Sequence, residues 1–248
     1  MDSGIDTDNS LLAHAIKGGT SVVDWSNNYE DYTGHGTKVA GTIITKHKNK
    51  IYGIAPDVEL YAVKITLSKS DGRTILSNII KGIEWSIENE MDIINISYDA
   101  RAVSKEFKRV AKRAKDNNIL IVNSTGNSNQ NVDNEITRCQ YEGVVCVSTL
   151  NKFDKLGYIS AYGKQYVHFG VAGINIVSAE INSNNPITVS GASYSAPVFV
   201  GLYALHKSEY PDATVDEIMT HMQKTVIKIN IDKPIGKYGK AYYIPMEL

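Results

Sequence analysis

The sequence around Ser193 suits a nucleophilic serine. It lies in the segment SGASYSAP, Ser190 to Pro197, between the strand-like Ile187 to Val189 and an apolar run from Val198 to Leu205. This order predicts that Ser193 sits at a helix start, where unpaired backbone N–H groups and the helix dipole favour negative charge. Small residues before a helix are more often only a cap, so this segment alone assigns no function.

His35 could supply the base that a serine nucleophile needs. It lies in GHGTKVAG, Gly34 to Gly41, where the glycines leave the ring open to a substrate or to a neighbouring loop. A lone histidine is usually structural, and glycine before a helix also marks phosphate sites. Both phosphate motifs fail here, because position 39 is not glycine and Thr42 stands where a P-loop needs lysine.

Three segments together resemble the signature of the subtilisin-like serine proteases, the subtilases. They are Asp2-Ser3-Gly4, HGTKVAG from His35 to Gly41, and GASYSAP from Gly191 to Pro197, in the chain order Asp, His, Ser. The α/β-hydrolases have another order, and Ser195 stands where their elbow needs its last glycine. Further matches are GIAP from Gly53, YAVKI from Tyr61, MDIINIS from Met91 and STGN ending at Asn127.

The resemblance implies a serine endopeptidase with a subtilisin-like three-layer α/β fold. It implies that His35 is the general base, that Asp2 orients it, and that Ser193 attacks the scissile carbonyl. The side chain of Asn127 and the backbone N–H of Ser193 would then bind the oxyanion. The implied substrate-binding residues are Ser97, Tyr98, Asp99 and Gly126.

Two other functional classes stay open at this point. One is a catalytically weak, subtilase-like binding or regulatory module, against which the complete set of Asp2, His35 and Ser193 argues. The other is a nucleotide-binding protein, which would rest on fold analogy and has no phosphate motif. A carboxylate at Asp99 in a substrate pocket would favour basic residues on the acyl side of the cut, whereas an exposed turn aspartate would have no such effect.

Strand-like and helical patterns alternate along the chain, which predicts a mainly parallel sheet covered by helices on both faces. Helices are expected over Thr74 to Asn89, over Ala102 to Asn118 and after both His35 and Ser193. The expected β-branched strands are Ser21 to Val23, Val58 to Ile65, Ile93 to Ser97, Ile119 to Asn123 and Val144 to Ser148.

The segment before Asp2 departs from the family pattern. The resemblance places the catalytic aspartate at the end of a central strand, but here it is residue 2. We therefore expect residues 1–248 to form one catalytic domain that lacks its first strand and any propeptide. Asp2 is then expected on a fraying terminus, with weakened folding or activity.

The metal expectation also departs from the family. The loop from Lys46 to Lys50 is mostly cationic, and Ser10 or Leu11 stands where an aspartate is expected, so the usual calcium site looks lost. We expect no required cofactor, with calcium only as a structural ion.

Composition limits the partners. The net charge of −1 gives no general reason to expect nucleic acid or membrane, so a polypeptide is the expected substrate, with a propeptide as a further partner. The cations between Arg101 and Lys115 are expected on the wet face of an amphipathic helix. Cys139 and Cys146 are expected as two buried thiols rather than a bridge. The compartment stays open between secreted, for a processed family member, and cytoplasmic.

Overall fold

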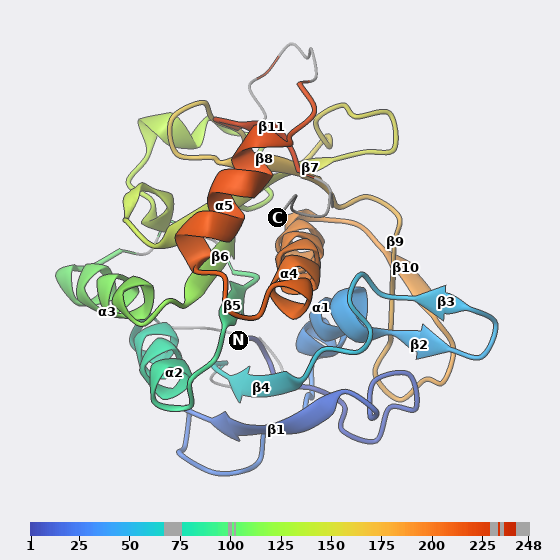
Figure 1. The fold of residues 1–248 in the computed structure, drawn as a ribbon. Helices are drawn as coiled ribbons and strands as arrows, with labels where there is room; N and C mark the ends of the chain where they lie inside the picture. The colour runs from blue at the N-terminus through green and yellow to red at the C-terminus, as the bar shows by residue number, and fades with distance from the viewer. Residues whose placement is uncertain (67–75, 99–100, 102, 229–232, 234–235, 242–248) are drawn as a thin grey trace.

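A five-stranded parallel sheet forms the centre of the protein (Figure 1). The computed structural model describes residues 1–248 apart from 67–75, 99–100, 102, 229–232, 234–235 and 242–248. In spatial order the strands are β11 (Gly239–Lys240), β8 (Phe169–Ala172), β7 (Val144–Leu150), β6 (Leu120–Ser124) and β5 (Ile93–Ile96). The predicted strands at 93–97, 119–123 and 144–148 are confirmed.

Helices cover both faces of this sheet and create two separate cores. The helices α2 (Leu76–Glu88) and α3 (Lys105–Asp116) lie on one face, and α1 (His35–Ile44), α4 (Ala192–Glu209) and α5 (Val215–Lys224) lie on the other. Side chains of a strand alternate between faces, so Leu120 and Val122 join the α1 and α4 core while Ile121 joins the α2 and α3 core. None of the described helices is long and apolar enough to cross a membrane.

A second, two-stranded parallel sheet lies beside β5. It consists of β1 (Ile16–Ser21) and β4 (Leu60–Lys64). Two small antiparallel pairs complete the described strands, β2 (Lys46–His47) with β3 (Ile51–Tyr52) and β9 (Ile176–Ser178) with β10 (Ile187–Val189). The expectation of a strand over Ser21 to Val23 is wrong, because β1 ends at Ser21.

The glycines of β1 account for that error. A Cβ atom at Gly19 would collide with the carbonyl of Ala62 on β4, so the two backbones approach as only glycine allows. Glycine is depleted in strands generally, and the segment IKGGTS therefore gives no strand signal of its own.

The cysteine expectation is also wrong. Cys139 and Cys146 form a disulfide that ties the short 3₁₀ helix η2 (Arg138–Gln140) to β7. Both residues are buried. The second 3₁₀ helix, η1 (Val132–Asn134), lies earlier in the same connection between β6 and β7.

The helix that carries many of the basic residues, α3, is an amphipathic surface helix. Phe107, Val110, Ala111 and Ala114 of α3 are buried, and Ser104 caps its N-terminus by accepting a hydrogen bond from the Phe107 N–H. Its cations pair with nearby carboxylates, for example Arg109 with Glu84 and Lys112 with Asp116. The helix therefore requires no nucleic acid to explain its charge.

Candidate active site

Asp2 and His35 meet although they are 33 residues apart. The Nδ1 atom of His35 lies 2.7 Å from Oδ1 of Asp2, which also accepts the Ser3 backbone N–H at 2.7 Å. Asp2 is buried, and its other carboxylate oxygen has no hydrogen-bond partner among the described residues. A side chain at Gly36 would collide with the Gly4 carbonyl, so the glycine after the histidine lets α1 approach the Asp2 loop.

The expectation that Asp2 lies on a fraying terminus is wrong. Its N–H donates to the Val63 carbonyl at 3.0 Å, and its carbonyl accepts from the Ile65 N–H at 2.8 Å. These bonds form a parallel bridge to the end of β4, with Asp2 opposite Lys64, the last residue of that strand. The backbone of Asp2 is therefore fixed to β4, and this positions the carboxylate.

The surroundings of His35 favour its protonated form. Burial of the ring acts to lower its pKa, but the charge of Asp2 and the hydrogen bond to it act in the opposite direction, with a further contribution from Asp31. The net result is a pKa above the ordinary histidine value. A histidine that gains a proton readily and is oriented through Nδ1 is suited to general base catalysis at Nε2.

Asp31 is a second buried carboxylate beside this pair, and the sequence analysis missed it. Its oxygens accept bonds from the Ser3 hydroxyl, from both the N–H and hydroxyl of Thr33 and of Thr37, and from the Gly34 N–H. Burial acts to raise its pKa, but these donors outweigh burial and hold the pKa below the ordinary aspartate value. Its position four residues before His35, in a polar loop, was the available signal.

Ser193 lies in the first turn of α4, as predicted. Its hydroxyl donates to the Ser97 carbonyl at 3.2 Å, and the Ser193 carbonyl accepts from the Ser97 hydroxyl at 2.8 Å. Pro197 explains the second bond, because proline has no N–H to donate to the carbonyl four residues earlier. The described residues contain no hydrogen bond between Ser193 and His35, although the rings of His35 and the adjacent Tyr194 are 6.2 Å apart.

Asn127 follows β6 and reaches the start of α4. Its Oδ1 atom accepts the Ala192 N–H at 2.9 Å, which fixes the amide beside Ser193. A pocket of about 250 Å³ opens at this point, lined by both residues and by Ser97 and Gly126. Two of the residues expected to bind substrate thus share one pocket with the expected nucleophile.

The other substrate-binding expectations fall elsewhere. The Tyr98 ring lies 5.7 Å from the His35 ring rather than in the pocket, and its carbonyl accepts from the Asn123 side chain at 2.8 Å. Asp99 lies outside the described residues. Sequence reasoning missed three residues that line the pocket, namely Arg101, Ser124 and Ser128. Arg101 was expected on the wet face of a helix, but α3 begins only at Lys105.

Comparisons with known proteins show the family of this chain. The sequence profile of the subtilase family, Peptidase S8, matches residues 1–240. The chain belongs to the subtilase family. It is 34% identical over 247 residues to the minor extracellular protease Epr of Bacillus subtilis, covering 98% of this chain and 37% of that protein. It is 30% identical over 236 residues to subtilisin BL of Lederbergia lenta, covering 92% and 82% of the two chains.

The fold of this subtilase agrees with a solved relative. The crystal structure of a cold-adapted subtilisin-like serine proteinase superposes with a TM-score of 0.83 at 24% identity, covering 97% of this chain and 87% of the other. The expected subtilisin-like α/β fold is thereby confirmed. The chain also spans 60% of a thermostable alkaline protease from Halalkalibacterium halodurans at 33% identity, so it is shorter than several relatives.

No cluster of His, Cys, Asp or Glu within the described residues of this subtilase is arranged to hold a metal ion. The cationic loop forms the hairpin of β2 and β3, and Lys46 pairs with Asp57 at 2.9 Å. The expectations of no required cofactor and of a lost calcium site stay predictions.

Proposed function

We propose that this subtilase is a serine endopeptidase that hydrolyses peptide bonds through an acyl-enzyme. The observation that carries the proposal is the 2.7 Å contact of buried Asp2 with His35 Nδ1, beside the helix start that bears Ser193. Family membership supports it, and several of the relatives carry protease names. The substrate is a polypeptide.

The proposed chemistry uses only groups of this chain. The Ser193 hydroxyl turns from the Ser97 carbonyl toward His35 Nε2, gives up its proton there and attacks the scissile carbonyl carbon. The Asp2 carboxylate stabilises the imidazolium, and the resulting oxyanion accepts bonds from the Ser193 N–H and the Asn127 side chain. His35 then protonates the leaving amine, and water repeats the sequence on the acyl-enzyme, releasing the carboxylic acid and restoring Ser193.

The pocket beside Ser193 is where the residue on the acyl side of the cut would bind. Ser97 and Gly126 line it, and an extended substrate lying along Ser97 would displace the contact that now occupies the Ser193 hydroxyl. Tyr98 would then border the substrate on the side of His35.

A fluorophosphonate probe tests the proposal directly, because it labels an activated serine. Ser193→Ala and His35→Ala should each abolish labelling and reduce peptide turnover by several orders of magnitude, since the triad acts as a unit. Ser208→Ala, an exposed serine on the same helix, is the matched control and should label normally.

Labelling that persists in Ser193→Ala would reject the assignment of the nucleophile. A folded wild-type chain that neither labels nor cleaves peptides would instead favour a binding or regulatory module.

A further inference from the structure

The His35 ring is held by one hydrogen bond among the described residues. Its Nδ1 atom lies 2.7 Å from Oδ1 of Asp2, and no described group bonds to Nε2, the atom that the proposed reaction uses as the base. One bond fixes one ring atom, but it does not by itself fix how the ring is turned about the line from Nδ1 to Asp2. The direction of Nε2 therefore depends on the groups that pack against the ring.

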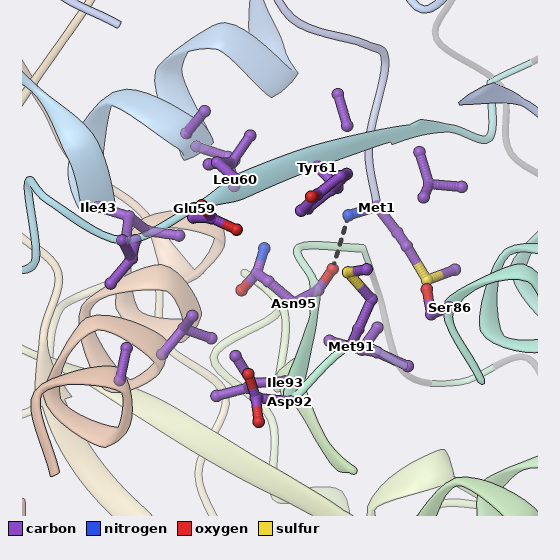
Figure 2. A pocket seen from close by; sticks show the side chains of 18 of the residues that line it. Met1, Ile43, Glu59, Leu60, Tyr61, Ser86, Met91, Asp92, Ile93 and Asn95 are labelled. Carbon is purple, nitrogen blue, oxygen red and sulfur yellow. Dashed lines mark hydrogen bonds between the residues drawn. The ribbon is translucent and has the colours of Figure 1, made fainter. Parts of the chain in front are cut away.

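The cavity next to the catalytic pair does not provide that restraint. It has a volume of about 660 Å³ and lies between β4 and β5, with Tyr61 and Asn95 among the residues on its walls (Figure 2). Asp2 and Gly36 line this cavity, but His35 does not. The groups that orient the His35 ring therefore lie elsewhere around it.

Two tyrosines approach the His35 ring from different parts of the chain. The Tyr98 ring, two residues after the end of β5, has its centroid 5.7 Å from that of the His35 ring. The Tyr194 ring, in the first turn of α4, has its centroid 6.2 Å away. The ring planes are tilted by 56° and 40°. Both distances lie in the range of roughly 4.5 to 7 Å over which aromatic rings attract one another.

Each tyrosine is itself held in place. The Tyr98 carbonyl accepts a hydrogen bond from the Asn123 side chain at 2.8 Å and one from the buried Arg138 at 3.4 Å. The Tyr194 N–H donates to the Gly191 carbonyl at 3.0 Å, and a Cβ atom at Gly191 would lie 3.7 Å from the Tyr194 ring. Side chains that are already ordered restrain a neighbour at little further cost in conformational entropy.

Tyr194 acts on His35 through its ring. Its hydroxyl takes part in no hydrogen bond among the described residues. Burial raises the pKa of this phenol, and the nearby charges of Asp2 and Glu180 raise it further. The phenol therefore stays neutral where His35 acts as a base, and it adds no second negative charge beside Asp2.

The Tyr98 ring is close enough to stabilise a positive charge on His35. An electron-rich ring attracts a cation that lies within about 6 Å of its centroid, and the 5.7 Å separation of the two rings meets that limit. Of the charged groups around His35, Asp2 and Asp31 favour the protonated ring, and Lys38 disfavours it together with burial. The aromatic contact adds to the effect of the two carboxylates.

We propose that Tyr98 and Tyr194 are positioning residues that hold the His35 ring with Nε2 toward the Ser193 hydroxyl and favour the imidazolium that forms there. This inference rests on the proposed function of His35 as the general base. When the Ser193 hydroxyl gives its proton to Nε2, the ring becomes a cation between the Asp2 carboxylate and the two aromatic rings. Neither tyrosine gains or loses a proton in this step.

Histidine NMR tests the proposal without relying on turnover. Chains labelled with ¹⁵N in histidine would be compared as wild type, Tyr98→Leu and Tyr194→Leu, with the His35 signals assigned by their absence in His35→Ala. In Tyr98→Leu the pKa of His35 should fall by about half a pH unit. In both Leu variants the downfield proton signal of the bond from Nδ1 to Asp2 should broaden, because the ring turns more freely.

Conservative variants separate the rings from their hydroxyls. Tyr98→Phe and Tyr194→Phe keep the rings and should leave the His35 signals as in the wild-type chain. Tyr52→Leu, which removes an exposed tyrosine of β3, is the matched control. The two Leu variants at the site should react with a fluorophosphonate probe about tenfold more slowly than the wild-type chain, whereas the Phe variants should keep its rate.

His35 signals that are the same in both Leu variants as in Tyr52→Leu would overturn the proposal. So would equal losses in the Phe variants, which would assign the effect to the hydroxyls. Because Tyr98 also packs against the core of α2 and α3, Tyr194→Leu keeps the test decisive if Tyr98→Leu unfolds. A wild-type chain that neither labels nor cleaves, but whose His35 signals still change in the Leu variants, would reject the proposed function and support the role of the two rings.

Discussion

Asp31 connects the two loops that carry the proposed catalytic pair. It accepts the Ser3 hydroxyl at 2.8 Å, and the same hydroxyl accepts the Gly36 N–H at 2.8 Å. The residue after Asp2 is thus bonded directly to the residue after His35, and its hydroxyl is oriented by the Asp31 carboxylate. Its other partners are Thr33 and Gly34, just before α1, and Thr37 in the first turn, so Asp31 holds the start of α1 against the Asp2 loop.

We expect Asp31→Asn to lower kcat about tenfold or more with little change in KM, since an amide cannot accept all six donors. The lost negative charge should also lower the pKa of His35, whose neutral form is the base. The acid limb of the kcat/KM profile should therefore move to lower pH.

Asp24→Asn, at an exposed turn, is the matched control for that measurement. If Asp31 only stabilised the loop, Asp31→Asn would lower the melting temperature but leave the acid limb where it is in the wild-type chain.

Arg101 is the one cationic residue among the described residues that line the pocket beside Ser193. The remaining described lining is neutral, comprising serines, Gly126 and Asn127, and a guanidinium matches a carboxylate better than any other side chain does. We expect substrates with Glu on the acyl side of the cut to be preferred over Gln, and Arg101→Gln to reduce that ratio of kcat/KM about tenfold.

Arg101→Lys keeps the charge and should retain most of this preference. Cleavage profiling that finds Lys or Arg preferred in the wild-type chain would contradict the prediction and favour a role for Asp99 instead.

At the scale of elements, the disulfide fixes the connection between β6 and β7, which contains Asn127. It joins η2 to β7, and Arg138 in η2 donates to the Asn123 side chain at 3.1 Å just before the pocket. Removing it by Cys139→Ala with Cys146→Ala should cost roughly 2 to 3 kcal/mol of unfolding free energy, the value for closing so short a loop.

The reduced wild-type chain is the control, because it has no bridge but keeps both sulfur atoms. Equal unfolding free energies for the oxidised and reduced wild-type chains, measured in urea, would show that the bridge adds no stability.

The sequence predicted those helices and strands whose own residues show a helical spacing of apolar side chains or a run of β-branched ones. The apolar spacing of α3 and the β-branched runs of β5, β6 and β7 sufficed. Such patterns failed where a neighbour decides the outcome, as for the glycines of β1, which are required by β4. The cysteine pair failed likewise, since only the folded path from η2 into β7 brings the two sulfur atoms together.

Across the whole molecule, motif order made the candidate site predictable in outline. The structure brings Asp2 and His35 together and fixes Asn127 against the first turn of α4, whereas the roles of these residues stay predictions. The resting contact of Ser193 with Ser97 was not predictable, since it depends on Pro197 and on the seating of α4 over β5. Arg101 was not predicted in the pocket either, because its charge was assigned to the wet face of the basic helix, whereas α3 begins only at Lys105.

Two histidines, the buried His206 and the partly buried His168, should make the fold sensitive to acid. Burial, together with Lys237, lowers the pKa of His168 to about 4, and its Nδ1 atom accepts the Cys146 N–H at 3.1 Å. Burial, together with His221, lowers the pKa of His206 to about 4. Both rings are therefore neutral in the folded chain at pH 6. In the unfolded chain the same two side chains take up protons near the ordinary histidine pKa of 6.5.

The unfolded state thus binds more protons between pH 6.5 and about 4, so stability is fully present above that range and is lost as the pH falls through it. His35 opposes this with its raised pKa, but one histidine is outweighed by two. Urea unfolding of the Ser193→Ala chain should show free energies that fall by up to about 1.4 kcal/mol per pH unit for each excess proton. His168→Gln keeps an acceptor for Cys146 and should flatten the slope, whereas exposed His14→Gln should not. Equal slopes in the two variants would mean that His168 is not one of the groups responsible.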